Sequence, residues 1–290
     1  KLSNIAVGEG TYEWTHADEA VRFAEANDIR LHGHTLFWHY SIPGFIREME
    51  GDTARIGQIF DQIVDDYIGR YKGKVAGWDI VNEVVNDQSD SMRETFWYRN
   101  LGPGYIARAF RRAHAADPDA ILFYNEYKIA RDSLKFSRVL KVLDELQADD
   151  VPIHGVGFQM HVEYDVPSLD QVRNVFRELV KRDLVIHVSE LDIAVNPRDT
   201  LRFTVMTDSL LQRQRERIEQ LTQIYIEEVP EDLRYGITMW GVSDKYSWYR
   251  TYLRYLDWPL LFDSHYRPKP AYDGLLEAAR AGAPRKSGAS

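Results

Sequence analysis

The sequence predicts an α/β fold of the (β/α)8 (TIM) barrel type, and three observations lead to that prediction. Short β-type runs alternate strictly with helical segments, which is typical of parallel strands joined by right-handed helical crossovers. Nearly every predicted strand ends in polar side chains, as on the active-site face of such a barrel. The chain has 290 residues, 44% of them hydrophobic, which is enough for one large domain with its own core.

Helical periodicity predicts seven helices. The first covers 15–27, where Thr15 and Asp18 form a capping-box pattern. The clearest covers 53–70, where six apolar residues recur at helical spacing and Asp52 or Thr53 can cap the start. The others are expected at 103–116, 133–146, 168–181, 209–228 and 271–279.

Six strands are predicted between these helices. They cover 29–38, 75–81, 120–124, 155–160, 184–188 and 235–239. The polar or aromatic residues that follow them are His39, Asn82, Glu83, Asn125, His161, Glu190 and Trp240. A doubly wound open sheet would instead gather its ligands at one switch point, and no glycine-rich phosphate loop is present. The distribution of polar strand ends therefore favours the barrel.

A closed barrel needs eight strands, and only strands 3 to 8 can be identified, because the chain opens with the helix that should follow the second. Upstream residues could be absent from this sequence, the barrel could be open, or a neighbouring chain could fill the gap. We favour the first explanation, since an open barrel would expose unpaired edges and apolar core. We predict one barrel domain at 1–280 and a disordered tail at 281–290.

Composition excludes several classes of function. The net charge is −9 and the basic residues are scattered, which argues against binding to nucleic acid or to an anionic membrane surface. No apolar run is long enough to span a bilayer, and the first ten residues lack the features of a signal peptide. The absence of cysteine excludes disulfides and thiolate chemistry. We expect a monomer that is secreted to the extracellular or periplasmic space, with a cytoplasmic location as the alternative.

Two of the 45 acidic residues stand out by their context. Glu83 closes the segment WDIVNE, and Glu190 lies in VIHVSELD, in each case at the end of an apolar strand. Glycosidases use two carboxyl groups: one protonates the leaving oxygen, and the other attacks the anomeric carbon or activates water. Strand ends at a barrel mouth can bring two such groups to one bond. These two glutamates are therefore our candidates for catalysis.

Six segments resemble, in order, the signatures of the family 10 glycoside hydrolases. They are GHTLFWH at 33–39, WDIVNE at 78–83, YNEY at 124–127, GFQMH at 157–161, SELDI at 189–193 and WGVSDKYSW at 240–248. The similarity extends from about residue 10 to residue 280. The resemblance implies a (β/α)8 barrel with retaining endo-β-1,4-xylanase activity, with xylan and xylo-oligosaccharides as substrates and with neither a metal nor an organic cofactor.

The resemblance also implies roles for individual residues. Glu83 corresponds to the general acid/base and Glu190 to the nucleophile, while Asn82 would contact the 2-hydroxyl of the sugar under attack. His161 and Asp192 match positions that form a hydrogen-bonded chain with the nucleophile. Two residues apart on one strand, Glu190 and Asp192 should face the same way. Substrate-binding positions of the family are matched by Lys1, His34, Trp38, Tyr127, Gln159, Trp240 and Trp248.

Three positions depart from the family's usual pattern. Ser41 stands where a glutamine is common, Lys128 where an asparagine is common, and Met160 where a serine is common. We expect these differences to affect substrate preference rather than the reaction.

Three alternatives remain open at this point. In the first, a metal hydrolase, His32 and His34 would form an HxH ligand pair that His161 and His187 could extend, and a chelator would abolish activity. In the second, a non-catalytic sugar-binding barrel, xylo-oligosaccharides would bind without turnover. In the third, the enzyme prefers a different β-1,4-glycan.

Overall fold

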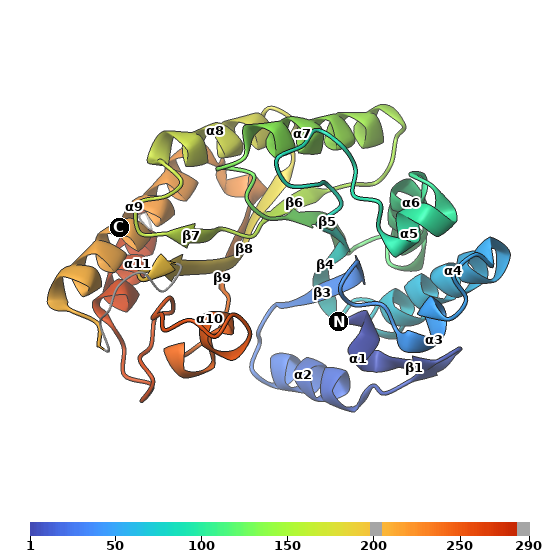
Figure 1. The fold of residues 1–290 in the computed structure, drawn as a ribbon, viewed down its shortest axis with the longest axis horizontal. Helices are drawn as coiled ribbons and strands as arrows, with labels where there is room; N and C mark the ends of the chain where they lie inside the picture. The colour runs from blue at the N-terminus through green and yellow to red at the C-terminus, as the bar shows by residue number, and fades with distance from the viewer. Residues whose placement is uncertain (198–204, 283–290) are drawn as a thin grey trace, which may run out of the picture. The chain divides into compact units, whose positions relative to one another are not determined.

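The computed structural model describes residues 1–197 and 205–282, and the chain divides into two compact units. The first unit is Lys1–Glu126 with Asp132–Gly157, and the second is Tyr127–Arg131 with Phe158–Ser290. The predicted alternation of strands and helices is confirmed within each unit (Figure 1). Of the predicted tail, residues 283–290 lie outside the described residues, and Ala281 is the last residue of a helix.

The first unit contains strand β4 (Val75–Asn82), which Glu83 directly follows. In the sheet, β3 (Leu31–Trp38), β4, β5 (Ile121–Glu126) and β6 (Gly155–Phe158, of which Phe158 belongs to the second unit) follow one another, and β4 is parallel to both β3 and β5. The long helices are α2 (Thr15–Ala26), α4 (Thr53–Arg70), α6 (Tyr105–Ala116) and α7 (Ser133–Ala148). Shorter elements are α1 (Leu2–Ile5), β1 (Ala6–Gly8), β2 (Thr11–Tyr12), α3 (Gly44–Arg47) and α5 (Phe96–Leu101).

Helix α4 forms as the sequence predicts. Asp52 is its N-cap, and the Asp52 carboxylate accepts a hydrogen bond from the backbone N–H of Arg55 at 3.1 Å. The apolar face is buried and comprises Ile56, Ile59, Phe60, Ile63, Val64 and Tyr67. The Phe60 ring stacks on Phe37 of β3 with ring centroids 3.9 Å apart. Each such side chain contributes roughly 1.5–3 kcal/mol by burial, so this face fixes α4 against the sheet.

The second unit contains the strand that carries Glu190. Strand β8 (Val185–Ala194) pairs in parallel with β7 (His161–Glu163) and with β9 (Arg234–Met239). The long helices are α8 (Leu169–Val180), α9 (Asp208–Glu228) and α11 (Pro270–Ala281), and α11 packs against α9 (Figure 1). Shorter elements are η2 (Glu231–Leu233), η3 (Asp244–Tyr246) and α10 (Trp248–Thr251).

Helix α8 is fixed at its start by a complete capping box. The Ser168 hydroxyl accepts from the backbone of Gln171 at 3.2 Å, and the Gln171 side chain accepts from the backbone of Ser168 at 2.8 Å. On the inner face of the helix, Phe176 packs on Tyr225 of α9, with ring centroids 5.5 Å apart. The cap and the apolar face together account for the position of this helix.

The capping box predicted at the first long helix is wrong. Trp14 is the N-cap of α2, and no side chain caps that position. Asp18 instead accepts hydrogen bonds from Arg70 at 3.1 and 2.6 Å and from the Tyr71 hydroxyl at 2.9 Å. A tertiary contact with the end of α4 has therefore replaced the local cap.

The predicted strand at 184–188 is too short. Strand β8 extends to Ala194, so Glu190 and Asp192 lie within the strand rather than after it. Both faces of β8 are buried, and a strand of that kind shows no alternation of polar and apolar residues to mark its end. Strands β1, β2 and β7 and the short helices were not predicted, because two to six residues give too little periodic signal.

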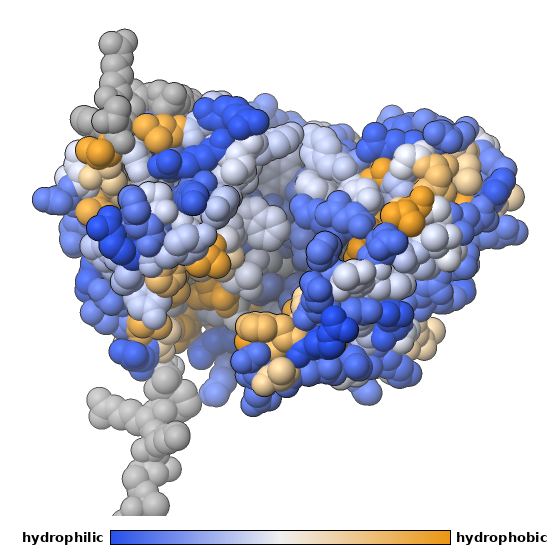
Figure 2. Space-filling view, turned by 90° about the horizontal axis from the view of Figure 1, so that it is seen from below, coloured by the Kyte–Doolittle hydropathy of each residue, from blue (hydrophilic) through white to orange (hydrophobic). Residues whose placement is uncertain are grey.

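The surface is mixed in polarity. On the face seen in Figure 2, hydrophobic residues form small groups among hydrophilic ones. Such scattered groups are normal for a globular protein and do not by themselves mark a binding site. Within the described ranges, no helix combines the length and the apolar character needed to cross a membrane.

Lys135 of α7 provides a test of the core of the first unit. Its side chain is 0% exposed, and its Nζ lies 2.9 Å from Glu126 Oε1 and 3.0 Å from Asp87 Oδ1. Burial raises the pKa of Glu126, whose carboxyl is also 0% exposed. Lys135→Met removes the buried cation, so we expect the free energy of unfolding to fall by about 3–5 kcal/mol, measured by urea titration.

The matched control for this prediction is Lys181→Met. The Lys181 ammonium pairs with Glu178 at 2.6 Å, but its side chain is 67% exposed and the pair is solvated. The control should leave the urea midpoint unchanged. If Lys135→Met unfolded at the same midpoint as well, the buried pair would not contribute to stability.

Candidate active site

Glu83 directly follows β4, in a conformation that few residues adopt. Its φ is 59°, in the left-handed region, and such a residue persists only where its surroundings hold it. The backbone N–H of Glu83 donates to the carbonyl of Asn125 at 3.0 Å. The end of the neighbouring strand β5 thus fixes the point at which β4 stops.

The Glu83 carboxyl accepts hydrogen bonds from two neighbouring side chains. Oε2 accepts from the Trp38 indole at 2.9 Å, and Oε1 accepts from the Asn82 amide at 3.1 Å. The orientation of that amide is set by Asn125, whose Nδ2 donates to Asn82 Oδ1 at 2.8 Å. His39 Nε2 lies 4.0 Å from Glu83 Oε2, and burial lowers the pKa of His39 to about 4, so its ring is neutral at pH 7. The structure thus brings together Glu83, Asn82 and Trp38, three of the predicted site residues.

The two histidines of the HxH pair both bind one buried carboxylate. His32 Nε2 lies 3.1 Å from Asp79 Oδ1, and His34 Nδ1 lies 2.8 Å from Asp79 Oδ2. Burial opposes ionisation of Asp79, but the two histidines hold the pKa of its carboxyl below its usual range. His187 is bonded to Thr238 at 2.8 Å.

This arrangement gives the metal-hydrolase alternative no support. Across residues 1–197 and 205–282, no group of three or more His, Cys, Asp or Glu side chains is placed to hold a metal ion. His32 and His34 of β3 instead contact the Asp79 carboxylate and so link β3 to β4.

The N-terminal segment reaches the same region of the first unit. Lys1 Nζ lies 4.1 Å from the centroid of the Trp38 ring, within range of a cation–π interaction. Ser41 is buried, and its hydroxyl lies 2.9 Å from the hydroxyl of Ser3 and accepts from the Ser3 N–H at 3.1 Å. The side chain at this departure from the family pattern is therefore bonded to the chain itself.

In the second unit, Glu190 and Asp192 share one histidine. Strand β7 pairs with β8 so that His161 lies opposite Asp192. His161 Nε2 lies 3.2 Å from Glu190 Oε2, and Nδ1 lies 2.9 Å from Asp192 Oδ2. The Trp248 indole donates to the same Asp192 oxygen at 2.7 Å. Glu190 and Asp192 therefore face the same way, as their spacing predicted.

The histidine between them is positively charged. Burial alone would lower the pKa of His161, but the carboxylates of Asp192 and Glu190 raise it to about 10. At pH 7 both ring nitrogens therefore carry protons and donate, one to each carboxylate. The imidazolium of His161 thus orients the Glu190 side chain.

The remaining predicted residues of the second unit surround this group. The backbone N–H of Glu190 donates to the carbonyl of Gln159 at 3.1 Å, and the backbone N–H of Trp240 donates to the carbonyl of Leu191 at 3.0 Å. The rings of Trp240 and Trp248 lie 6.0 and 5.2 Å from the His161 ring, centroid to centroid. Two indoles thus border the imidazolium.

Tyr127 and its neighbour Lys128 lie on the segment 127–131 of the second unit. Lys128 Nζ lies 5.1 Å from the centroid of the Tyr127 ring. Lys128 and Met160 both have positive φ, at 59° and 55°, and Met160 is buried. Two of the three departures from the family pattern thus occupy left-handed positions.

Comparison with known proteins decides the family. Residues 1–278 match the model of glycosyl hydrolase family 10. The chain belongs to this family. It is 37% identical over 301 residues to "Endo-1,4-beta-xylanase A" of Cellvibrio japonicus (strain Ueda107), covering 96% of this chain and 49% of that protein. It is 34% identical over 281 residues to "Endo-1,4-beta-xylanase B" of Paenibacillus barcinonensis, covering 94% and 84%.

Solved structures agree with the family assignment. Xylanase 10B from Thermotoga petrophila RKU-1, in complex with xylobiose, superposes with a TM-score of 0.89 at 34% identity, covering 97% of this chain and 83% of that one. The predicted (β/α)8 fold class is thereby confirmed. This family 10 chain spans about half the length of the Cellvibrio relative, as the 49% coverage states.

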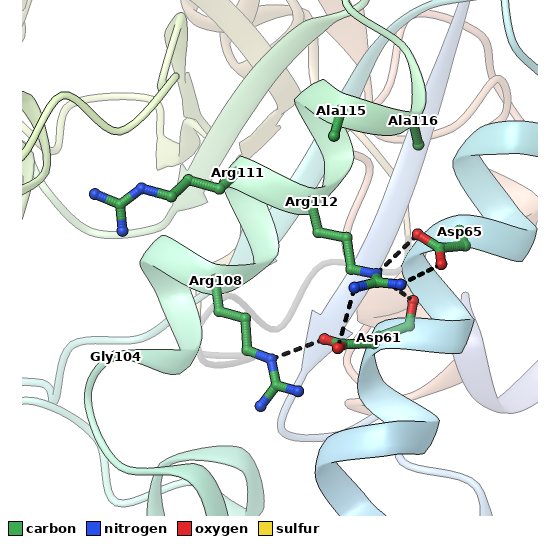
Figure 3. Close-up of a pocket in the computed structure, with 8 residues that line it drawn as sticks. All are labelled: Asp61, Asp65, Gly104, Arg108, Arg111, Arg112, Ala115 and Ala116. Carbon is green, nitrogen blue, oxygen red and sulfur yellow. Dashed lines mark hydrogen bonds and ion pairs between the residues drawn. The ribbon is translucent and has the colours of Figure 1, made fainter.

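One surface hollow of the family 10 chain lies apart from all predicted site residues. It has a volume of about 690 Å³ and lies between α4 and α6 of the first unit (Figure 3). Arg108 donates to Asp61 at 2.7 Å, and Arg112 pairs with both Asp61 and Asp65. Both guanidinium groups are paired with carboxylates of α4. The side chains that line the hollow therefore link α6 to α4.

Two residues of this family 10 site were missed from the sequence. Arg93 donates to the backbone carbonyls of Glu83 and Val85, but it is an isolated arginine in a loop and follows no pattern. Asp79 could have been found, because a charge inside the apolar strand WDIVNE needs a buried partner.

The charge on His161 predicts a pH-dependent stability. Because its folded-state pKa of about 10 lies above the ordinary 6.5, its contribution is fully present below about pH 6.5 and is lost as pH rises through about 10. We expect the difference in unfolding free energy between the wild type and His161→Gln to shrink steadily over this range. Urea titrations at about pH 6, 8 and 10 measure it, and a constant difference would refute the assignment.

Proposed function

We propose that this chain is a retaining endo-β-1,4-xylanase that hydrolyses internal linkages of xylan by double displacement. The observation that carries the proposal is a pair of glutamates in a family 10 chain, one directly after β4 and one within β8, that have different hydrogen-bond partners. Glu83 is held by an indole and an amide, whereas Glu190 is held by an imidazolium. The names of the relatives, which are xylanases, and the xylobiose in one solved neighbour support the substrate class.

In the first step, a carboxylate oxygen of Glu190 attacks the anomeric carbon while Glu83 gives its proton to the glycosidic oxygen. The carbon–oxygen bond to the leaving chain breaks as the ester bond to Glu190 forms. The imidazolium of His161 keeps Glu190 oriented throughout, and Asp192 in turn holds His161. The proton and the nucleophile thus come from two groups that need no cofactor.

In the second step, Glu83 is a carboxylate and takes a proton from an incoming water molecule. The water oxygen attacks the anomeric carbon, and the ester bond to Glu190 breaks. Two inversions at the same carbon give net retention. The Asn82 amide would contact the sugar 2-hydroxyl, a hydrogen bond that strengthens as the oxocarbenium-like transition state forms.

The indoles supply binding surface for the sugar chain. Trp38 in the first unit and Trp240 and Trp248 in the second each lie against a proposed catalytic group or its partner. Large, rigid apolar rings with a polar edge suit the faces of pyranose rings. Tyr127, His34, Lys1 and Gln159 complete the proposed substrate-binding set.

The compartment and the oligomeric state belong to the same proposal. A polymeric substrate such as xylan has to be met outside the cell, which favours secretion. A barrel whose catalytic groups all come from one chain needs no second copy, which favours a monomer.

Substitution of either glutamate tests the mechanism. Glu83→Ala and Glu190→Ala should each lower kcat on xylan by about 100-fold to 10,000-fold, since each removes a group that acts in the transition state. The exposed Glu145→Ala is the matched control and should keep the wild-type rate. Wild-type rates in either active-site variant would refute the assignment.

Azide separates the two roles, because it can replace the missing carboxylate. With Glu190→Ala, azide should attack the substrate directly and give an inverted glycosyl azide. With Glu83→Ala, azide should attack the glycosyl–enzyme ester and give a retained one. Proton NMR of the products distinguishes these outcomes, and the reverse assignment of products would exchange the two roles.

Product analysis tests the substrate class. Incubation with linear xylan should yield short xylo-oligosaccharides, whereas soluble cellulose derivatives should yield none, as chromatography can show. Products from the cellulose derivatives alone would identify a different β-1,4-glycanase. Tight calorimetric binding of xylo-oligosaccharides without any products would identify a binding barrel.

A further inference from the structure

The loop that follows Glu83 folds back on the end of its own strand. Val85 and Met92 form an antiparallel bridge, and the Asn86 N–H donates to Ser91 at 3.1 Å. The Arg93 N–H then donates to the carbonyl of Val84 at 2.7 Å. The hairpin thus delivers Arg93 to the residues that come directly after the strand.

Arg93 binds the backbone on both sides of Val84. Its Nε donates to the carbonyl of Glu83 at 3.0 Å, and its Nη2 donates to the carbonyl of Val85 at 3.1 Å. The side chain is 22% exposed, so water competes little for these bonds. A planar guanidinium presents its donors in a fixed fork, which an ammonium cannot reproduce.

These bonds complete the restraint on Glu83. Its N–H is held by Asn125 and its carbonyl by Arg93, so the two peptide groups that flank its Cα are both fixed. Its φ of 59° belongs to a sparsely populated region and needs such support. Fixed peptide planes determine the direction of the Cα–Cβ bond, and therefore where the carboxyl can reach.

A partly buried ionic network connects Arg93 to the rest of the first unit. Asp87 Oδ1 lies 3.9 Å from Arg93 Nη2 and 3.0 Å from Lys135 Nζ. Lys135 pairs in turn with Glu126, whose Oε2 accepts from the Val85 N–H at 3.4 Å. The loop is thus tied through ionic contacts to α7 and β5.

We infer that Arg93 is a positioning residue for the acid/base: its guanidinium holds the left-handed backbone of Glu83 so that the carboxyl reaches the leaving oxygen. This inference rests on the proposed function, in which Glu83 is the proton donor. Arg93 acts through backbone carbonyls and needs no contact with substrate.

The inference predicts a defect that depends on the leaving group. Misplacement of a proton donor slows the loss of a sugar alkoxide, which needs a proton as it departs. A 2,4-dinitrophenolate leaves without one, so its loss is spared. A purely structural defect would lower both rates equally, because it would reduce the amount of active enzyme.

The experiment compares kcat/KM for xylohexaose and for 2,4-dinitrophenyl β-xylobioside on the same preparation. The ratio of the two values is independent of the fraction of correctly folded protein. In Arg93→Met, we expect kcat/KM for xylohexaose to fall about 100-fold, the typical result of a misplacement near 1 Å, and that for the aryl substrate to change less than about 3-fold. Arg93→Lys should lie between, since one ammonium cannot serve both carbonyls as the fork does.

Two further variants make the result decisive. Arg99→Met is the matched control, because Arg99 also donates to a backbone carbonyl, that of Glu94 at 2.8 Å, and its side chain is 48% exposed. Its substrate ratio should equal that of the wild type. Glu83→Ala provides the reference, with a selective loss larger than that of Arg93→Met.

Each outcome decides between the claims. A selective loss in both Arg93 variants with an unchanged ratio in Arg99→Met supports the inference. An equal loss on both substrates, or no loss, overturns it while leaving the role of Glu83 intact. If Glu83→Ala itself loses activity equally on both substrates, the acid/base assignment falls, and the role of Arg93 falls with it.

Discussion

Three carboxylates that this fold buries are paired with basic side chains, and the need for such pairing constrains how the neighbouring strands and helices are placed. Asp79, Glu126 and Asp192 have carboxyls that are at most 1% exposed. Each is met by a cationic or titratable partner: the histidines of β3, Lys135 of α7, and His161 of β7, respectively. An unpaired charge at such a position would cost several kcal/mol. Strand register and helix position are therefore set by electrostatics as well as by apolar packing.

The two proposed catalytic glutamates differ in what this constraint leaves around them. Glu83 accepts hydrogen bonds from an indole and an amide, and the nearby His39 is neutral at pH 7. Glu190 instead faces the imidazolium of His161, which also binds Asp192. The difference follows from the neighbouring strands, because the glutamate side chains themselves are identical.

The sequence predicted best those features whose causes are local. Helix α4 begins and ends where its cap and its apolar periodicity place it, and α8 covers Leu169–Val180 where the sequence predicts a helix at 168–181. The prediction failed where a distant partner decides the outcome. Asp18 has the right spacing for a capping box but pairs with Arg70, 52 residues away. The role of Arg93 could not be predicted from neighbouring residues. Its side chain donates to two backbone carbonyls that come within reach only when the hairpin has folded.

The same reasoning explains which parts of the site can vary. The side chains nearest to the proposed chemistry are bound to one another, so replacing His161 would disturb Glu190 and Asp192 together. Ser41 is different, because its hydroxyl is bonded to Ser3, outside the hydrogen bonds of both glutamates. A change at such a position can alter how a sugar is held without altering how a proton is transferred. The departure from the family pattern at Ser41 is therefore compatible with the proposed reaction, and its effect should appear in the choice of substrate.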